Sequence, residues 1–156
     1  MTVRVATAED AERLLEWRND TGTRAASRMT AEIAPGEHAA WLVRVLVDGD
    51  CQLLIGEHAG APVGQARFDA LDDGRYEISV GLAREARGRG LGAPLIAAAV
   101  AWLRTRTAAT IVAEVREDNA PSLRAFSRAN FTEVSAARGW RRLECAGVDD
   151  GPPASR

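Results

Sequence analysis

A run of arginines and glycines at residues 84–95, REARGRGLGAPL, stands directly before the apolar stretch IAAAVAWLRT. Glycine accepts positive φ angles, so such a run can turn several backbone amides to one side. The first turn of a helix adds unpaired amides and the positive end of its dipole. A turn of this kind binds a pyrophosphate, and we expect Arg87 and Arg89 to add charge-assisted hydrogen bonds to the same oxygens.

Three other interpretations of this turn compete with that one. An arginine-rich surface loop that caps a helix is the simplest, and a P-loop is excluded because no Gly-Lys-Ser/Thr follows. A dinucleotide fingerprint remains, since Gly88, Gly90 and Ala93 match G-x-G-x-x-A. Position argues against it, because residues 83–87 separate the turn from its strand and three antiparallel strands come first.

The hydrophobic periodicity around the turn alternates between strands and helices. We expect strands around Val3 and Val5 and then within residues 51–60, 61–71, 75–82, 110–117, 131–137 and 139–145. We expect helices within residues 7–20, 35–48, 92–105 and 119–129, with a loop or a broken helix at residues 21–34. The three strands between residues 51 and 82 should form an antiparallel meander.

Length and composition indicate one ordinary domain. The chain has 156 residues and is 46% hydrophobic, enough for a single core. We expect that domain at residues 1–146 and a disordered tail at residues 147–156, which are rich in Gly, Pro and Asp. Without a membrane-length apolar run or a signal-peptide pattern, we expect a cytoplasmic protein with no membrane partner.

Charge and cysteine content exclude further functions. The formal net charge of −2 argues against nonspecific nucleic-acid binding, which needs a net basic face. Cys51 and Cys145 lack metal-ligand spacing, so we expect two small buried hydrophobes and no metal site.

Two motifs in sequence order resemble one family. Residues 87–92, RGRGLG, are similar to the acetyl-CoA motif Q/R-x-x-G-x-G/A of the GNAT superfamily of N-acetyltransferases. Residues 119–131, NAPSLRAFSRANF, resemble its later motif N-x-x-S/A-x-x-x-Y-x-x-x-G-F. The likeness in element order covers roughly residues 3–145. It implies an α+β, GNAT-type fold with a central, mostly antiparallel, splayed sheet of six to seven strands and about four helices.

The resemblance also implies an activity and a cosubstrate. An acetyl group would move from acetyl-CoA to a primary amine, of a small molecule or a peptide N-terminus, by direct attack in a ternary complex. Segments near Arg18 and His38 are similar to ribosomal-protein-alanine and amino-sugar-nucleotide acetyltransferases, whose first helices border the acceptor. Arg18, Arg24 and Arg28 would then either bind an anionic acceptor or be ordinary surface arginines.

The cofactor site follows from the same resemblance. The amides of residues 87–92 would hold the pyrophosphate, and the backbone of Val80 and Leu82 would pair with the pantetheine arm. The Asn119 side chain would bind the pantetheine or thioester end, although Asn before Ala-Pro-Ser is also a good helix N-cap. The full expected cofactor set is Val80, Leu82, Arg87, Gly88, Arg89, Gly90, Leu91, Gly92, Asn119, Ser122 and Phe126.

Two positions depart from the family pattern. The usual Tyr, the proposed acid for the leaving thiolate, is Phe126, which can pack against the cofactor but donates no proton. Protonation is then left to water, to Ser122 or to no enzyme group. Asn130 replaces the usual Gly, and since Asn tolerates the left-handed conformation, we expect it to keep the helix stop.

Glu77 is the candidate general base, because it lies on the strand that leads to the turn and shares a face with Ser79. A solvated glutamate is the alternative interpretation. His58 could also reach the cleft, whereas His38 should pack with Trp41. Because Phe126 lacks a hydroxyl and no base is compelling, a non-catalytic acyl-CoA-binding or sensing domain is the alternative function.

Oligomeric state is open at this point. Trp140, on the last strand pair, could mark the edge of a homodimer or complete the core.

Overall fold

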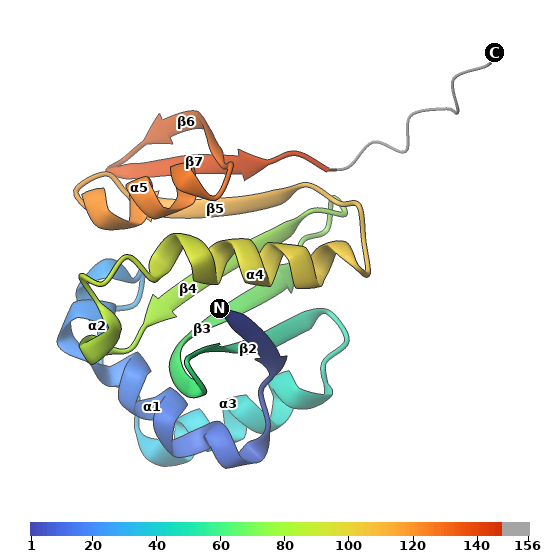
Figure 1. The fold of residues 1–156 in the computed structure, drawn as a ribbon. Coiled ribbons are helices and arrows are strands. Elements are labelled where there is room, and N and C mark those ends of the chain that lie inside the picture. Colours follow the sequence, from blue (N-terminus) through green and yellow to red (C-terminus); the bar gives the residue numbers. More distant parts are fainter. Residues whose placement is uncertain (148–156) are drawn as a thin grey trace.

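A seven-stranded sheet with the order β1-β2-β3-β4-β5-β7-β6 forms the centre of the computed structural model, which describes residues 1–147 (Figure 1). Its strands are β1 (Thr2–Val5), β2 (Cys51–His58), β3 (Ala61–Ala70), β4 (Tyr76–Leu82), β5 (Ile111–Arg116), β6 (Thr132–Ala137) and β7 (Trp140–Cys145). The sheet confirms the predicted fold class, and all but one of its neighbouring pairs are antiparallel.

Five α-helices and two short 3₁₀ helices connect the strands in this part of the chain. They are η1 (Ala8–Asp10), α1 (Ala11–Asn19), α2 (Thr21–Ala26), α3 (Pro35–Val47), η2 (Arg84–Ala86), α4 (Gly92–Arg104) and α5 (Ala120–Arg128). For residues 21–34 the sequence predicted either a loop or a broken helix. The structure resolves this as α2, whose N-cap Asp20 accepts a hydrogen bond from the Thr23 amide.

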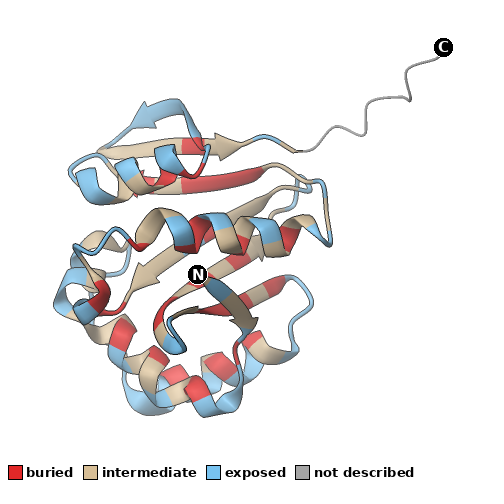
Figure 2. Ribbon diagram, in the orientation of Figure 1, coloured by how far each residue is buried: buried red, intermediate tan, exposed pale blue. Residues whose placement is uncertain are grey.

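The helices cover the two faces of the sheet and give two cores. One core joins α4 and α5 to residues such as Phe68 and Ile78, and the other joins α1 and α3 to residues such as Leu53 and Ile55. Figure 1 shows α4 and α5 in front of the sheet and α1 to α3 grouped at the bottom, and Figure 2 shows buried positions recurring along both sets. Successive strand residues therefore point into different cores.

Close contact between α4 and the sheet depends on Gly56. A Cβ at that position would clash with Leu95, which is fully buried on α4. Since no side chain stands there, the helix can lie directly over β2, and this fixes α4 and the turn before it.

The sheet splays between β4 and β5. These strands run parallel and pair only at Tyr76–Ile111 and Glu77–Val112. Beyond Glu77, β4 continues to Leu82 with β3 as its sole partner, while β5 moves away to pair with β7. The predicted splay is therefore present, and Figure 1 shows the two strands diverging toward α2.

A buried carboxylate holds the start of α1 to the sheet. Asp10 is 1% exposed and accepts two hydrogen bonds of 2.8 Å from Arg4 and one of 2.9 Å from Arg13. The Thr7 amide adds a fourth at 2.9 Å, which fulfils the predicted capping box. The hydrogen bonds from Arg4 lower the pKa of Asp10 to about 2.

Two expectations from the sequence change with the structure. Trp140 cannot mark a sheet edge, because β7 is paired on both sides, with β5 and β6. Cys145 is half-buried, whereas Cys51 is buried as expected, and burial raises the pKa of the Cys51 thiol to about 12. Apart from Gly147, the expected tail lies outside the described residues.

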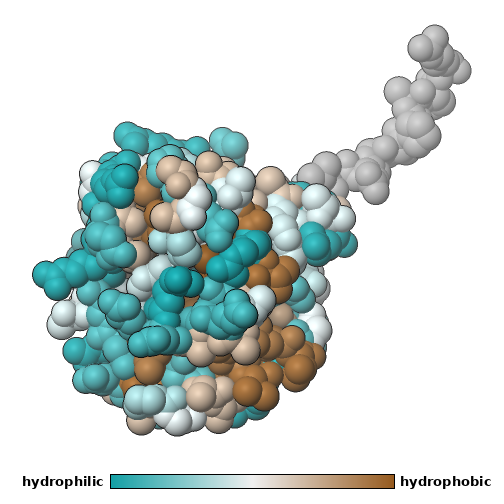
Figure 3. Space-filling view, turned by 60° about the horizontal axis from the view of Figure 1, so that its bottom comes forward, coloured by the Kyte–Doolittle hydropathy of each residue, from teal (hydrophilic) through white to brown (hydrophobic). Residues whose placement is uncertain are grey.

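The surface is mostly hydrophilic on the side that carries α1 to α3, with an apolar area at the lower right of the view (Figure 3). Within residues 1–147, no helix is long and apolar enough to span a membrane.

Candidate functional site

The glycine-rich turn adopts the backbone that its sequence predicts. Gly88 and Gly90 have φ angles of +71° and +73°, which a side chain would strain. No heavy atom lies within 4 Å of the place where a Cβ would stand on either glycine, so the turn opens to solvent. After it, α4 begins at Gly92.

The amides of this turn lack partners. Across the described residues, no hydrogen bond uses the amides of residues 88–92, and no side chain caps α4 at Leu91. Unpaired amides in front of a 13-residue helix provide a concentrated positive potential. An anion with several oxygens, such as a pyrophosphate, fits this arrangement.

The Arg87 side chain, expected from the sequence to bind the anion, is bound in this structure to α2 and to the end of β4. Its Nη1 lies 2.7 Å from Oδ2 of Asp20, and its Nη2 donates to Oγ1 of Thr23 at 2.9 Å. The same guanidinium donates to the carbonyl of Leu82 at 3.2 and 3.3 Å. Gly22 permits this approach, since a Cβ there would lie 2.6 Å from Nη1. Arg87 therefore ties the turn to α2.

Arg89 remains available for an anion. It is exposed, and within residues 1–147 it forms no ion pair or side-chain hydrogen bond. Its guanidinium can supply the charge-assisted contact that Arg87 does not.

The open edge of β4 faces the splay. The Tyr76 amide donates to Thr110 beside β5, whereas the Ala83 amide donates to Val63 of β3. Because backbone groups alternate along a strand, Val80 and Leu82 direct theirs toward the splay. The Leu82 carbonyl accepts from Arg87, so within residues 1–147 the Leu82 amide and both backbone groups of Val80 are unpaired. An extended ligand could add to β4 as a further strand.

The first turn of α5 carries the second motif beside α4. Asn119 caps it, because its Oδ1 accepts from the Ser122 amide at 3.2 Å, and its Nδ2 has no partner among the described residues. A Cβ on Gly92 would lie 3.1 Å from that of Ala125, so the two helices touch where α4 begins. Asn119 can thus cap the helix and still donate to a ligand.

Phe126 lies in the core, so only a small part of its ring is available to a ligand. It is 4% exposed and meets Phe131 edge-to-face with ring centres 5.0 Å apart. Asn130, with a φ of +66°, ends the helix as predicted.

The face of the sheet opposite α4 carries a set of charged residues, which we call the acceptor face. It includes Glu77 and Ser79 of β4, which stand opposite Asp69 and Arg67 of β3. Arg28, which follows α2, crosses to the far side of the splay and lies 3.4 Å from Glu114 of β5. The segment after α2 therefore spans the splay above this face.

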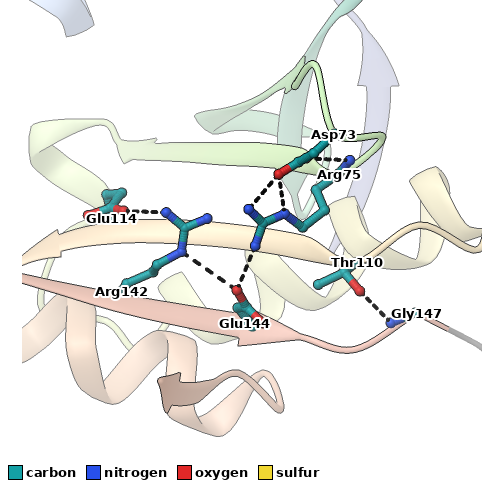
Figure 4. Close-up of polar contacts among 7 residues, drawn as sticks. All are labelled: Asp73, Arg75, Thr110, Glu114, Arg142, Glu144 and Gly147. Carbon is teal, nitrogen blue, oxygen red and sulfur yellow. Dashed lines mark hydrogen bonds and ion pairs between the residues drawn. The ribbon is translucent and has the colours of Figure 1, made fainter. Parts of the chain in front are cut away.

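Glu77 differs from the other carboxylates of the acceptor face. Asp69, Glu114 and Glu144 all form ion pairs, whereas Glu77 forms none within residues 1–147. Figure 4 shows Arg142 between Glu114 and Glu144, and Arg75 beside Glu144. Their partners are Arg67 for Asp69, Arg28 and Arg142 for Glu114, and Arg75 and Arg142 for Glu144. A carboxylate without a cation can take a proton from a ligand.

The two histidines stand on other elements than Glu77, His58 on β2 and His38 on α3. His58 ends β2 and pairs with Ala61 beside the hairpin turn, beyond the residue that pairs with the end of β4. His38 is 4% exposed on α3 and packs with Trp41 at 5.2 Å, as predicted. Burial, and next the charge of Arg18, lower its pKa. Neither histidine competes with Glu77 as the base.

Other features of the surface do not coincide with this site. Two shallow hollows of about 270 and 480 Å³ lie beside η1 and α1, and both are lined by Glu9, Arg13 and Pro62. Within residues 1–147, no group of three His, Cys, Asp or Glu side chains could hold a metal ion.

Comparison with known proteins gives one family. Residues 11–131 match the family described as "Acetyltransferase (GNAT) family". The mycothiol acetyltransferase of Corynebacterium kroppenstedtii is 39% identical over 62 residues, which are 40% of this chain and only 17% of that protein's length. A second mycothiol acetyltransferase, of Corynebacterium aurimucosum, is 40% identical over 65 residues, or 42% of this chain and 21% of its own length.

Solved structures share the fold over almost the whole chain. The ribosomal-protein-alanine N-acetyltransferase from Brucella melitensis has a TM-score of 0.79 at 24% identity, covering 94% of this chain and 99% of its own. The aminoglycoside acetyltransferase AAC(6')-Ib in complex with coenzyme A has a TM-score of 0.77 at 22% identity, covering 93% and 94%.

Proposed function

Since the chain belongs to the acetyltransferase (GNAT) family, we propose that it transfers the acetyl group of acetyl-CoA to a primary amine in a ternary complex. One observation carries this proposal. The unpaired amides of residues 88–92 adjoin the open edge of β4, so a pyrophosphate and the extended arm that follows it have adjacent places.

Each part of acetyl-CoA has residues that suit it. The turn amides and Arg89 would hold the pyrophosphate, and the Val80 carbonyl and the Leu82 amide would pair with the pantetheine arm, which leaves the Val80 amide for the thioester end. Asn119 Nδ2 would donate to the arm from the opposite side of the splay. When bound, acetyl-CoA supplies a thioester whose carbonyl carbon is open to attack by an amine.

The residues of β4 would carry the chemical step. Glu77, directly or through a water, takes a proton from the ammonium group so that the neutral nitrogen can attack. The Val80 amide stabilises the negative charge that develops on the carbonyl oxygen. The C–N bond forms, the C–S bond breaks with CoA leaving as the thiolate, and the second amine proton passes to solvent or, through water, to that thiolate, because Glu77 already holds the first.

No tyrosine is needed to protonate the leaving sulfur. A thiol with an ordinary pKa of about 8.5 leaves readily as the thiolate near neutral pH. Phe126 at the usual Tyr position is therefore compatible with catalysis, with water or Ser122 as the proton source.

A non-catalytic acyl-CoA-binding domain is the second candidate function. The burial of Phe126 favours it, because the ring offers neither a hydroxyl nor much contact surface. This candidate predicts acetyl-CoA binding without acetyl transfer to any amine.

The relatives and structural neighbours are named as mycothiol, ribosomal-protein-alanine and aminoglycoside acetyltransferases, so their names indicate different kinds of acceptor. A cytoplasmic location and a homodimer stay predictions.

Thermal unfolding with acetyl-CoA, CoA and NAD added separately tests the cosubstrate, because a ligand that binds only the native state raises its stability. We expect acetyl-CoA and CoA to raise the unfolding temperature and NAD to leave it unchanged. Release of CoA in the presence of a panel of amines then separates the enzyme from the binding domain. Stabilisation by NAD alone, or by none of the three, would overturn the proposal.

A further inference from the structure

We infer that the acceptor is an amine that also carries an acidic group, a carboxylate or a phosphate, and that Arg18 and Arg24 bind that group. This inference rests on the proposed acetyl transfer and names its acceptor class. Three charged side chains carry the inference: Arg18, Arg24 and Glu77. None of them forms an ion pair within residues 1–147.

Arg18, in the last turn of α1, holds a charge that the protein does not neutralise. It is half-buried, and its Nη2 donates to the carbonyl of Met29 at 2.9 Å. Its Nη1 is buried without any hydrogen-bond partner. Burial, and then the nearby charges of Arg24 and Arg67, lower the pKa of Arg18. A buried donor on a cation without an acceptor is costly, so an anionic oxygen would stabilise this side chain.

Arg24, in the last turn of α2, repeats this pattern. Among the described residues its Nε is buried without a partner, and its one side-chain hydrogen bond is a long one of 3.4 Å to the Thr30 carbonyl. The two guanidinium groups, from different helices, donate to the adjacent carbonyls of Met29 and Thr30 and keep unused donors. A carboxylate or phosphate accepts from such groups in pairs.

The other arginines of the acceptor face differ from these two. Arg28, Arg67 and Arg142 each lie within 4 Å of a carboxylate. This contrast is what separates Arg18 and Arg24 from ordinary surface arginines. The positive charge left over at the face is concentrated at α1 and α2.

The two arginines lie near the proposed reaction centre. They donate to the carbonyls of Met29 and Thr30, which directly follow Arg28, and Arg28 lies 3.4 Å from Glu114 on the acceptor face. Glu77 stands on the same face of the sheet. An acceptor with its amine at Glu77 and its acidic group at Arg18 and Arg24 would complement all three charges. A polycationic amine would meet like charges instead.

Residues 27–34 cover this place. They are held to α1 by Arg18 and by Asn19, which donates to the Ile33 carbonyl at 2.8 Å and accepts from its amide at 2.9 Å. We expect this segment to shift when an acceptor reaches the two guanidinium groups.

The test compares amines in matched pairs on protein saturated with CoA. γ-Aminobutyrate is set against butylamine, and glucosamine 6-phosphate against glucosamine, so that the two pairs distinguish a carboxylate from a phosphate. The readout is the NMR signal of His38, which feels the charge of Arg18. We expect at least one acidic member to shift this signal at concentrations about tenfold lower than its neutral counterpart.

Variants connect that preference to the two arginines. Arg18→Gln and Arg24→Gln should each weaken binding of the acidic member about tenfold or more, without changing CoA affinity. Arg106→Gln, an exposed arginine beyond the far end of α4, is the matched control and should leave both unchanged.

Two results would overturn the inference while acetyl-CoA still binds: no shift with either acidic amine, or a stronger response to spermidine than to any acidic amine. Loss of acetyl-CoA binding in the wild type would instead contradict the proposed function.

Discussion

Nη1 of Arg87 lies 2.7 Å from Oδ2 of Asp20, and this contact joins the candidate cofactor turn to the helix that borders the acceptor. The Asp20 carboxylate also accepts from the Thr23 amide at 3.1 Å and so caps α2. The hydrogen bond from Arg87 lowers the pKa of Asp20. The turn and the start of α2 are therefore connected through this ion pair, and its loss should be felt in the turn.

Asp20→Asn tests this connection, because Asn still caps α2 but removes the charge that holds Arg87. We expect the free energy of unfolding to fall by less than about 1 kcal/mol, as for a partly exposed ion pair. We also expect acetyl-CoA to bind more weakly, because the turn loses an anchor. Calorimetric titration with acetyl-CoA measures this affinity. If Arg87 were instead a direct ligand of the pyrophosphate, releasing it from Asp20 would leave the affinity equal or raise it.

Glu77→Gln should slow acetyl transfer while leaving acetyl-CoA binding intact. Removing a general base typically costs about 10²- to 10⁴-fold in rate, so we expect kcat to fall in that range with little change in the KM for acetyl-CoA. Glu133→Gln, on exposed β6, is the matched control. A Glu77→Gln enzyme with normal kcat would assign Glu77 to the solvated surface.

The sequence predicted the backbone of the site better than its side chains. Glycine, at residues 88 and 90, and asparagine, at residue 130, tolerate positive φ better than other residues, so residue type indicates both the turn and the helix stop. Arg87 was assigned to the anion because arginine beside a glycine turn suits one. Its partners, Asp20 and Thr23, are more than 60 residues away, and no local pattern reveals such a contact.

The sequence also could not show which charged side chains lack an ion-pair partner. Whether Glu77 or Arg18 has an ionic partner depends on the register of β4 against β3 and on the path of residues 27–34. The N-cap pattern at Asn19-Asp20-Thr21 was the one available indication of α2, and through it of a partner for Arg87.

His38 should titrate below the usual histidine pKa, because burial and the charge of Arg18 both disfavour the imidazolium. Its protonation therefore favours unfolding. The stability linked to neutral His38 is present above the unfolded pKa and is lost as the pH falls toward the folded one. With two histidines in the chain, NMR titration resolves both. Arg18→Gln should raise the pKa of His38. An unchanged pKa would show that the charge of Arg18 does not act on His38.

Asp10 should make stability depend on acid. Its folded pKa of about 2 lies below the ordinary value of 3.8, so its contribution is complete above about pH 4 and is lost as the pH falls toward 2. Asp10→Asn should lower the free energy of unfolding by about 2 kcal/mol at pH 7, because it leaves Arg4 and Arg13 without their buried partner, and by much less near pH 2. Asp72→Asn, on an exposed turn, is the control. Equal losses at both pH values would contradict this assignment.

Calorimetric titration of acetyl-CoA into the wild type and into Gly90→Ala tests the central claim most directly. Alanine has space at this position, yet a φ of +73° strains it by about 1 kcal/mol, so the turn amides should move while the fold persists. We predict one site in the wild type and an affinity at least tenfold lower in the variant, with unfolding still cooperative. No binding by the wild type, or equal binding by both proteins, would contradict the assignment of residues 88–92 as the cofactor site.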